Sequence, residues 1–216
     1  VMGIVAVGQE VARHEDPILL KGEGRYTGDV TLPNQAYGYV ARSPHAHASI
    51  QAIDTSAAKI APGVLAILTG KDCKMDGLGK LPLVVPPLPN LNIERIRSPE
   101  RFPLATDKIN FVGQEVAFIV AETLNQAKDA AELIEIEYNP LPVVVNALDA
   151  LKDDAPQVWS DCPGNLSFSE EMGDKKATDA AFTSAKHVVK LRTIVNRSSA
   201  NTIESRGTNA DFNPAS

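Results

Sequence analysis

The first third of the chain has the hydrophobic pattern of β structure. Residues 48–53 alternate small or apolar side chains with polar ones, as a half-buried strand does. Residues 35–42 are interpreted as the strand before it. The apolar run at 64–69 predicts a buried strand after it.

Short connecting elements are expected around these strands. Asp54 and Thr55 offer N-caps to a short helix over residues 56–60, which Pro62-Gly63 ends. Gly70-Lys71-Asp72, directly after the third strand, is interpreted as a turn.

The clearest unit follows. Residues 115–121 form a nearly continuous apolar run and predict a strand. Thr123 and Gln126 have the spacing of a capping box. In this motif the Thr hydroxyl accepts a hydrogen bond from the N3 amide, and the Gln side chain bonds the backbone amide of the N-cap residue. The helix after them has one apolar face, made of Leu124, Ala127, Ala131 and Ile134. Residues 134–138 alternate again, so strand, helix and strand are interpreted as a βαβ-type packing unit, which α+β sheets also contain.

Prolines crowd residues 81–103: Pro82, Pro86, Pro87, Pro89, Pro99 and Pro103. Proline removes ladder donors and blocks helices, so we expect an extended loop. A polyproline ligand for a partner domain is the alternative. The apolar residues at 81 and 83–85 favour a loop packed on its own protein.

After Pro142 a second region begins, with residues 146–165 interpreted as a linker. Asp174 is expected to cap a helix with an alanine face, made of Ala177, Ala180, Ala181 and Ala185. Residues 187–195 predict a long strand and residues 208–212 the next one. This region is too small to bury both faces of its strands, so we expect polypeptide outside this chain to cover their apolar side.

Composition places the chain among ordinary globular proteins. Its 216 residues are 44% hydrophobic and 22% charged, enough for one large domain or for one domain and part of another. The net charge of −6 and the lack of a basic cluster argue against nucleic-acid binding. No signal peptide or membrane span is visible. Two distant cysteines without a CxxC motif favour the cytoplasm as the compartment.

Candidate metal and nucleotide sites are few. Cys73 and Cys162 are far apart, whereas a cysteine-ligated site needs about four ligands, so two buried, inert thiols are expected. The spacing GxGxxxG at residues 22–28 differs from the dinucleotide fingerprint, and turn glycines are favoured over a nucleotide-binding enzyme. His45 and His47 would face one side of a strand and could begin a metal site. A hydrogen-bonded structural pair or an interface pair is favoured, because a third ligand would have to come from elsewhere.

The polar turn at residues 201–207, which contains Glu204 and Arg206, is either a pocket rim or a plain turn. No serine elbow, catalytic Cys–His pair or paired-acid constellation stands out. The residues by themselves therefore support an α+β scaffold whose last strands need cover from polypeptide outside this chain.

Five segments carry a family resemblance: residues 7–17, 21–29, 42–48 (Arg-Ser-Pro-His-Ala-His-Ala), 62–70, and 111–117 (Phe-Val-Gly-Gln-Glu-Val-Ala) running on to 138–142. In this order and spacing they resemble the large, molybdopterin-binding subunit of molybdenum hydroxylases, a group that includes xanthine dehydrogenase, aldehyde oxidase and aerobic carbon monoxide dehydrogenase. Residues 195–197 and 204–207 look like the start of the following cofactor-binding domain. There Ser205 stands where the family commonly has proline.

The resemblance implies an α+β fold with an α/β-hammerhead domain over residues 1–145, a linker over 146–165, and the first elements of a molybdopterin-binding domain over 166–216. Members of this oxidoreductase family hydroxylate aldehydes or N-heteroaromatics with water as the oxygen source, or oxidise carbon monoxide. Their molybdopterin-bound Mo passes electrons through [2Fe-2S] clusters to FAD. The expected partners are the remainder of the molybdopterin subunit, an iron–sulfur subunit and an FAD subunit.

The residues that perform this chemistry in the family lie downstream, and its Gly-Gly-Phe-Gly-type loop is absent here because the chain contains no Gly-Gly. We therefore expect an N-terminal fragment of the molybdenum-binding subunit, not active alone, with no catalytic, cofactor-binding or metal-binding residue. Gln114, Arg197, Glu204 and Arg206 are expected to approach the active-site funnel or a domain interface. A non-catalytic scaffold or interaction domain with a hammerhead fold is the alternative.

Overall fold

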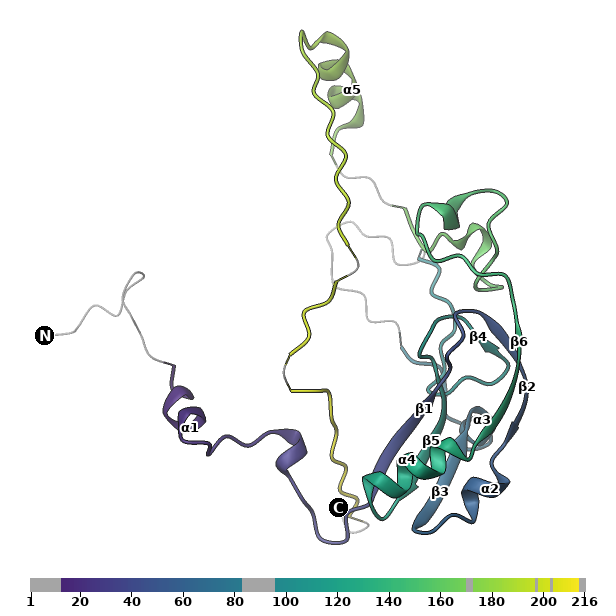
Figure 1. The fold of residues 1–216 in the computed structure, drawn as a ribbon. Helices are drawn as coiled ribbons and strands as arrows, with labels where there is room; N and C mark the ends of the chain where they lie inside the picture. The colour runs from purple at the N-terminus through teal and green to yellow at the C-terminus, as the bar shows by residue number, and fades with distance from the viewer. Residues whose placement is uncertain (1–12, 83–95, 170–172, 197, 203, 214–216) are drawn as a thin grey trace, which may run out of the picture. The chain divides into compact units, whose positions relative to one another are not determined.

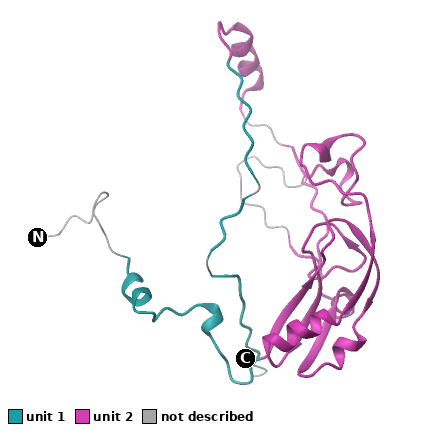
Figure 2. Ribbon diagram, in the orientation of Figure 1, with its two compact units in different colours: residues 1–35, 189–216 teal, residues 36–188 magenta. Residues whose placement is uncertain are grey.

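The computed structural model describes residues 13–82, 96–169, 173–196, 198–202 and 204–213. The chain divides into two compact units, which Figure 2 colours separately. We call residues 1–35 with 189–216 unit 1, and residues 36–188 unit 2. Within the described ranges, every helix is too short or too polar to span a bilayer.

Unit 2 contains two three-stranded antiparallel sheets (Figure 1). In the first sheet, β5 (Glu115–Ala121) lies between β1 (Tyr37–Arg42) and β3 (Val64–Thr69). In the second sheet, β2 (Ala48–Asp54) lies between β4 (Lys108–Ile109) and β6 (Glu135–Pro140). The five strands expected between residues 35 and 138 are confirmed, and so is the α+β class.

The helix α4 (Leu124–Glu132) packs on the first sheet and encloses the main core. Its buried stripe consists of Ala127 and Ala130, flanked by the partly buried Ala131 and Ile134. The predicted face was therefore wrong at its first position: Leu124 is exposed, and the i, i+3, i+4, i+7 stripe starts one turn later.

The N-terminus of α4 is capped largely as predicted. The Thr123 hydroxyl oxygen accepts a hydrogen bond from the Gln126 amide at 3.3 Å. The same hydroxyl donates to Gln126 Oε1 at 2.8 Å, so the reciprocal bond joins the two side chains. The Gln126 side chain also packs over Gly63, whose φ of +75° turns the chain into β3.

The βαβ interpretation of residues 115–138 was wrong, because β5 and β6 belong to different sheets. Both edges of β5 are already paired, with β1 on one side and β3 on the other, so β6 pairs with β2 instead. Val116 of β5 points away from α4 and joins Ala48, Ala105 and Ile109 in a second core beside the second sheet.

Two short helices follow β2 and β3. The predicted helix at residues 56–60 is confirmed as α2 (Ser56–Lys59), and the Asp54 carboxylate accepts a hydrogen bond from the Ser56 amide at 2.8 Å. The turn expected after β3 is instead the helix α3 (Gly70–Met75). Its cap explains the difference: Asp72 Oδ2 accepts from both the amide and the hydroxyl of Thr69, at 2.7 and 2.6 Å.

Residues 146–165 form an ordered loop of unit 2 with two short 3-10 helices, η3 (Asp149–Leu151) and η4 (Pro163–Asn165). The Asn165 side chain organises it by donating to the Ala150 and Pro156 carbonyls at 2.9 and 3.0 Å and accepting from the Val158 amide at 2.9 Å. The domain boundaries expected at residues 145 and 165 stay predictions.

The proline-rich stretch has neither helix nor strand in its described parts, residues 81–82 and 96–103. Residues 83–95 lie outside the described residues. The Leu81 amide donates to the Arg101 carbonyl at 2.7 Å, and the Arg97 amide donates to the Ser167 carbonyl at 2.9 Å. These two bonds join the described parts to unit 2, but Leu81 is exposed, so the choice between a packed loop and a partner ligand stays a prediction.

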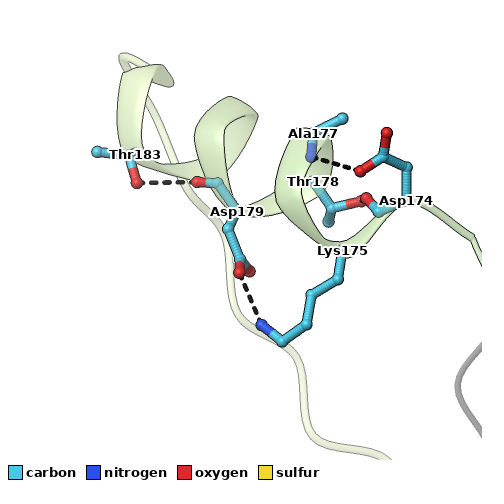
Figure 3. Close-up of polar contacts among 6 residues, drawn as sticks. All are labelled: Asp174, Lys175, Ala177, Thr178, Asp179 and Thr183. Carbon is cyan, nitrogen blue, oxygen red and sulfur yellow. Dashed lines mark hydrogen bonds and ion pairs between the residues drawn. The ribbon is translucent and has the colours of Figure 1, made fainter.

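The predicted helix of the second region is α5 (Lys175–Ser184), and Asp174 caps it by accepting from the Ala177 amide at 2.8 Å (Figure 3). Lys175 and Asp179 form an ion pair at 2.6 Å on its surface. The helix buries none of its residues, so its alanine face has no cover among the described residues.

The strands expected at residues 187–195 and 208–212 are absent, and both segments are irregular in the structure. A strand requires a neighbouring backbone to complete its ladder, and neither segment pairs with a described strand. The apolar side chains that suggested strands are exposed, with Val189 at 91%, Leu191 at 86% and Phe212 at 88%.

Unit 1 contains the helix α1 (Asp16–Leu20) and the 3-10 helix η1 (Thr27–Asp29). Gly22 lies between them with φ of +72°, which confirms it as a turn glycine. In η1 the Tyr26 amide donates to the Asp29 carboxylate at 2.9 Å.

Candidate functional site

Three of the segments that carry the family resemblance meet at one corner of unit 2. The connection between β1 and β2 lies against residues 111–115: the Ser43 amide donates to the Gln114 carbonyl at 3.0 Å, and the Gly113 amide donates to the Ser43 carbonyl at 2.8 Å. On the other side, the Leu141 amide donates to the His47 carbonyl at 3.0 Å. These contacts join the connection between β1 and β2 to the segment before β5 and to the segment after β6.

Arg42 and Glu115 form an ion pair on the exposed side of this corner. The Arg42 guanidinium donates to the Gly113 carbonyl at 2.8 Å and to the Glu115 carboxylate at 2.7 Å. Burial opposes ionisation of Glu115, but hydrogen bonds from its own amide and from Arg42, together with the Arg42 charge, leave the pKa of Glu115 below its usual value.

Both predicted histidines lie at this corner. They lie in the connection before β2, with His47 buried and His45 half-buried. His47 Nδ1 is 2.6 Å from the Pro142 carbonyl oxygen, which can only accept, so Nδ1 carries the proton. The His45 ring packs against Tyr138 with 4.7 Å between centroids, and burial raises the pKa of the Tyr138 phenol. Both rings contact their own unit, His47 through a hydrogen bond and His45 through ring packing, and the choice between a structural pair and an interface pair stays a prediction.

Gln114, the first candidate site residue, is only 8% exposed. Its Oε1 accepts a hydrogen bond from the Asn110 amide at 2.8 Å, and the side chain lines a cavity within unit 2. The structure thus places Gln114 at a cavity wall, and its proposed role at a funnel or domain interface stays a prediction.

Glu204 lines a second hollow, within unit 1. The Thr27 amide donates to Glu204 Oε1 at 3.0 Å, and Asn209 Nδ2 donates to the Thr27 carbonyl at 2.9 Å. The hollow is also lined by Tyr26, Gly28, Asp29, Asn201, Thr202, Ser205 and Gly207. The sequence predicts turn glycines at residues 22–28. No local pattern there indicates the contact of Thr27 with Glu204, which lies 177 positions along the chain.

The other two candidates are not brought into this hollow. Arg206 is exposed and is absent from the residues that line it. Arg197 lies outside the described residues. Only Glu204 of the polar-turn candidates therefore makes a described contact with the N-terminal segment.

The described residues offer no side-chain ligand set for a metal ion or an iron–sulfur cluster, and contacts to molybdopterin stay a prediction. Among them, no three His, Cys, Asp or Glu side chains gather where they could hold a metal ion. Cys73 and Cys162 are separate buried thiols. Burial raises the pKa of Cys73, with the nearby Asp72 and Asp76 carboxylates adding to it, which disfavours the thiolate that a metal requires.

Known proteins resemble this chain across most of its length. Residues 21–142 match the family model described as aldehyde oxidase and xanthine dehydrogenase, a/b hammerhead domain. The chain is 38% identical over 196 residues to the carbon monoxide dehydrogenase large chain of Afipia carboxidovorans, covering 85% of this chain and 23% of that protein. It is 34% identical over 209 residues to the 6-hydroxypseudooxynicotine dehydrogenase complex subunit gamma of Paenarthrobacter nicotinovorans, covering 97% and 26%.

Solved structures of similar enzymes also superpose on this chain. The Cu,Mo-CO dehydrogenase in its carbon monoxide reduced state superposes with a TM-score of 0.70 at 38% identity, covering 83% of this chain and 23% of that chain. Quinoline 2-oxidoreductase from Pseudomonas putida 86 superposes with a TM-score of 0.60 at 35% identity, covering 69% and 18%.

The chain spans about a quarter of the length of the curated relatives it matches. Those relatives are named as a large chain, a large subunit or a subunit of a complex. The family model covers more than half of this chain, over the residues that build both sheets. The chain belongs to the aldehyde oxidase and xanthine dehydrogenase family, through its a/b hammerhead domain.

Proposed function

We propose that the chain is the hammerhead part of the molybdenum-binding large subunit of a molybdenum hydroxylase. The observation that carries this proposal is the similarity of most of the chain to less than a quarter of a carbon monoxide dehydrogenase large chain. Within such a subunit the two sheets and their corner at Ser43 and Gln114 serve as a rigid scaffold. The remainder of the subunit, an iron–sulfur subunit and an FAD subunit supply the cofactors.

The reaction of the whole assembly is oxidation of an aldehyde, an N-heteroaromatic compound or carbon monoxide, with water as the oxygen source. Identities between 33% and 38% extend to subunits of enzymes named for carbon monoxide, for 6-hydroxypseudooxynicotine and for nicotine. This narrow range supports the class of enzyme rather than one substrate.

Molybdenum analysis tests the proposal. The purified 216-residue chain is expected to contain no molybdenum and to reduce no dye with carbon monoxide, benzaldehyde or quinoline. The complete large subunit, expressed with its partner subunits, is expected to contain molybdenum and to turn over one of them. Stoichiometric molybdenum with turnover in the isolated chain would refute the proposal. A complete assembly that binds its partners without redox activity would favour a non-catalytic scaffold.

A further inference from the structure

The cavity beside Gln114 has the size of a small-molecule site and walls of mixed polarity. Its volume is about 560 Å³, within the range of ligand pockets of about 300–1,000 Å³. Leu104 and Ala105 are buried at its wall, and the aromatic rings of Phe102 and Trp159 line it as well. Most of the other lining residues are polar or charged, so the cavity combines a polar wall with a smaller apolar part and two rings that a planar ligand can contact.

The Gln114 amide presents hydrogen-bond donors to this cavity. Because the Asn110 backbone amide can only donate, the side-chain atom that it contacts must be Gln114 Oε1, which fixes the orientation of the amide group. Gln114 Nε2 makes no hydrogen bond with the described residues. It is also not among the fully buried polar atoms that lack a hydrogen bond. Nε2 therefore reaches the solvent-accessible surface, and its two N–H groups favour a ligand with an oxygen acceptor.

The charges around the cavity disfavour an anion. Two lysines and three carboxylates line it: Lys80, Lys108, Glu100, Asp107 and Asp161. Lys80 is paired with Glu100 at 3.1 Å, and Lys108 donates to the Val158 carbonyl at 3.1 Å, so both cations are occupied. Asp161 makes no hydrogen bond or ion pair within the described part of the chain, and its carboxylate can accept from an N–H group.

We propose that this cavity binds a neutral, planar carboxamide. The carbonyl oxygen of the ligand accepts from Gln114 Nε2, its N–H group donates to Asp161, and its plane lies against Trp159. A carboxamide carries both an acceptor and a donor without net charge, which matches the free groups of the cavity. The same group can belong to a small aromatic amide or to a Gln or Asn side chain of another polypeptide. This site is independent of the proposed molybdenum hydroxylase function.

A fluorine NMR titration of the 216-residue chain tests the site. The probe is 4-fluorobenzamide, with 4-fluorobenzoate as the matched anion and 4-fluorotoluene as the matched compound without hydrogen-bonding groups. We expect 4-fluorobenzamide to bind at least about tenfold more tightly than either control, which corresponds to one well-formed hydrogen bond. A parallel titration uses N-acetylglutamine methylamide. If this compound binds more tightly than 4-fluorobenzamide, the site is supported and its ligand is a polypeptide side chain.

Two variants locate the binding. Gln114→Glu keeps the oxygen that accepts from Asn110 but removes the Nε2 donors, so we expect about tenfold weaker binding of 4-fluorobenzamide. Asp161→Asn is expected to weaken binding of 4-fluorobenzamide severalfold. Because Asp161 is exposed, this variant tests the site even if Gln114→Glu unfolds the chain. Glu137→Gln, on the exposed side of β6, is the control that should leave binding unchanged. Equal binding of the three fluorinated probes, or unchanged affinity in both cavity variants, would overturn the proposal.

Discussion

At the scale of single residues, close packing decides where substitution is tolerated. Gly70 begins α3 at a point where a Cβ atom would overlap the carbonyl oxygen of Ala105, a buried backbone atom that cannot rotate away. Gly79 is surrounded by open space and does not have a positive φ. The two glycines therefore form a matched pair for measuring the effect of that overlap.

We expect Gly70→Ala to lower the free energy of unfolding by about 1–3 kcal/mol, as overpacking of a core does. Gly79→Ala should change it by less than about 0.5 kcal/mol. Urea denaturation followed by the fluorescence of Trp159, the one tryptophan of the chain, measures both. Equal midpoints for the two variants would show that the α3 junction is not tightly packed.

The Arg42–Glu115 pair gives a pH-dependent prediction. The pKa of Glu115 is lowered in the folded chain, so the pair contributes its full stability above the usual glutamate value of 4.5 and loses it as pH falls through the folded pKa. Arg42→Met should lower the free energy of unfolding by about 0.5–1 kcal/mol at pH 7. This difference from wild type should shrink as the pH falls below 4.5.

Denaturation curves at pH 7 and pH 4 measure this difference. Lys152→Met removes a surface pair with Asp149, in which both side chains are more than half exposed, and should change little at either pH. A difference between wild type and Arg42→Met that stays constant with pH would exclude Glu115 as its source.

At the scale of elements, the same capping chemistry has different consequences in α4 and α5. Thr123 caps a helix that contributes Ala127 and Ala130 to the main core, whereas Asp174 caps a helix that buries nothing. A helix without tertiary packing can unfold locally and leave the rest of the fold intact.

We expect Thr123→Ala to lower the global free energy of unfolding by about 1 kcal/mol, the usual effect of losing a cap. Asp174→Ala should leave global unfolding unchanged but accelerate amide hydrogen exchange in α5 by about fivefold, the equivalent of that same energy. Circular dichroism in urea and exchange mass spectrometry distinguish the two effects. Equal losses of global stability would show that α5 is packed in solution.

At the scale of the whole molecule, residues 189–195 show what the described chain leaves without cover. Val189, Leu191, Ile194 and Val195 are β-branched or apolar side chains of the kind that strands bury, yet they are exposed. The proposed function supplies a reason, because a complete large subunit would provide backbone for a ladder and a second layer for these side chains.

Hydrogen exchange tests this expectation. Amides at residues 189–195 should exchange at least about a hundredfold more slowly in the complete large subunit than in the 216-residue chain. Amides of β6 in the second sheet, already paired with β2, should exchange at similar rates in both. Fast exchange of residues 189–195 in the complete subunit would mean that this segment is not a covered strand.

Local sequence patterns predicted most of the described strands and α-helices. Alternation and apolar runs located the strands β1, β2, β3, β5 and β6, and side-chain caps located α2, α4 and α5. These features could be predicted because each depends on residues within one or two turns or along one strand. The ordered family segments extended the prediction to the hammerhead fold, which the family match over residues 21–142 confirms.

Tertiary structure alone decided how these elements combine. Strand pairing separated β5 from β6, because both edges of β5 were occupied, and packing moved the buried face of α4 from Leu124 to Ala130. The junction of Ser43 with Gln114 and the contact of Thr27 with Glu204 join residues 71 and 177 positions apart. Such contacts depend on which surfaces meet after folding, and no local pattern of hydrophobic and polar residues encodes that distance.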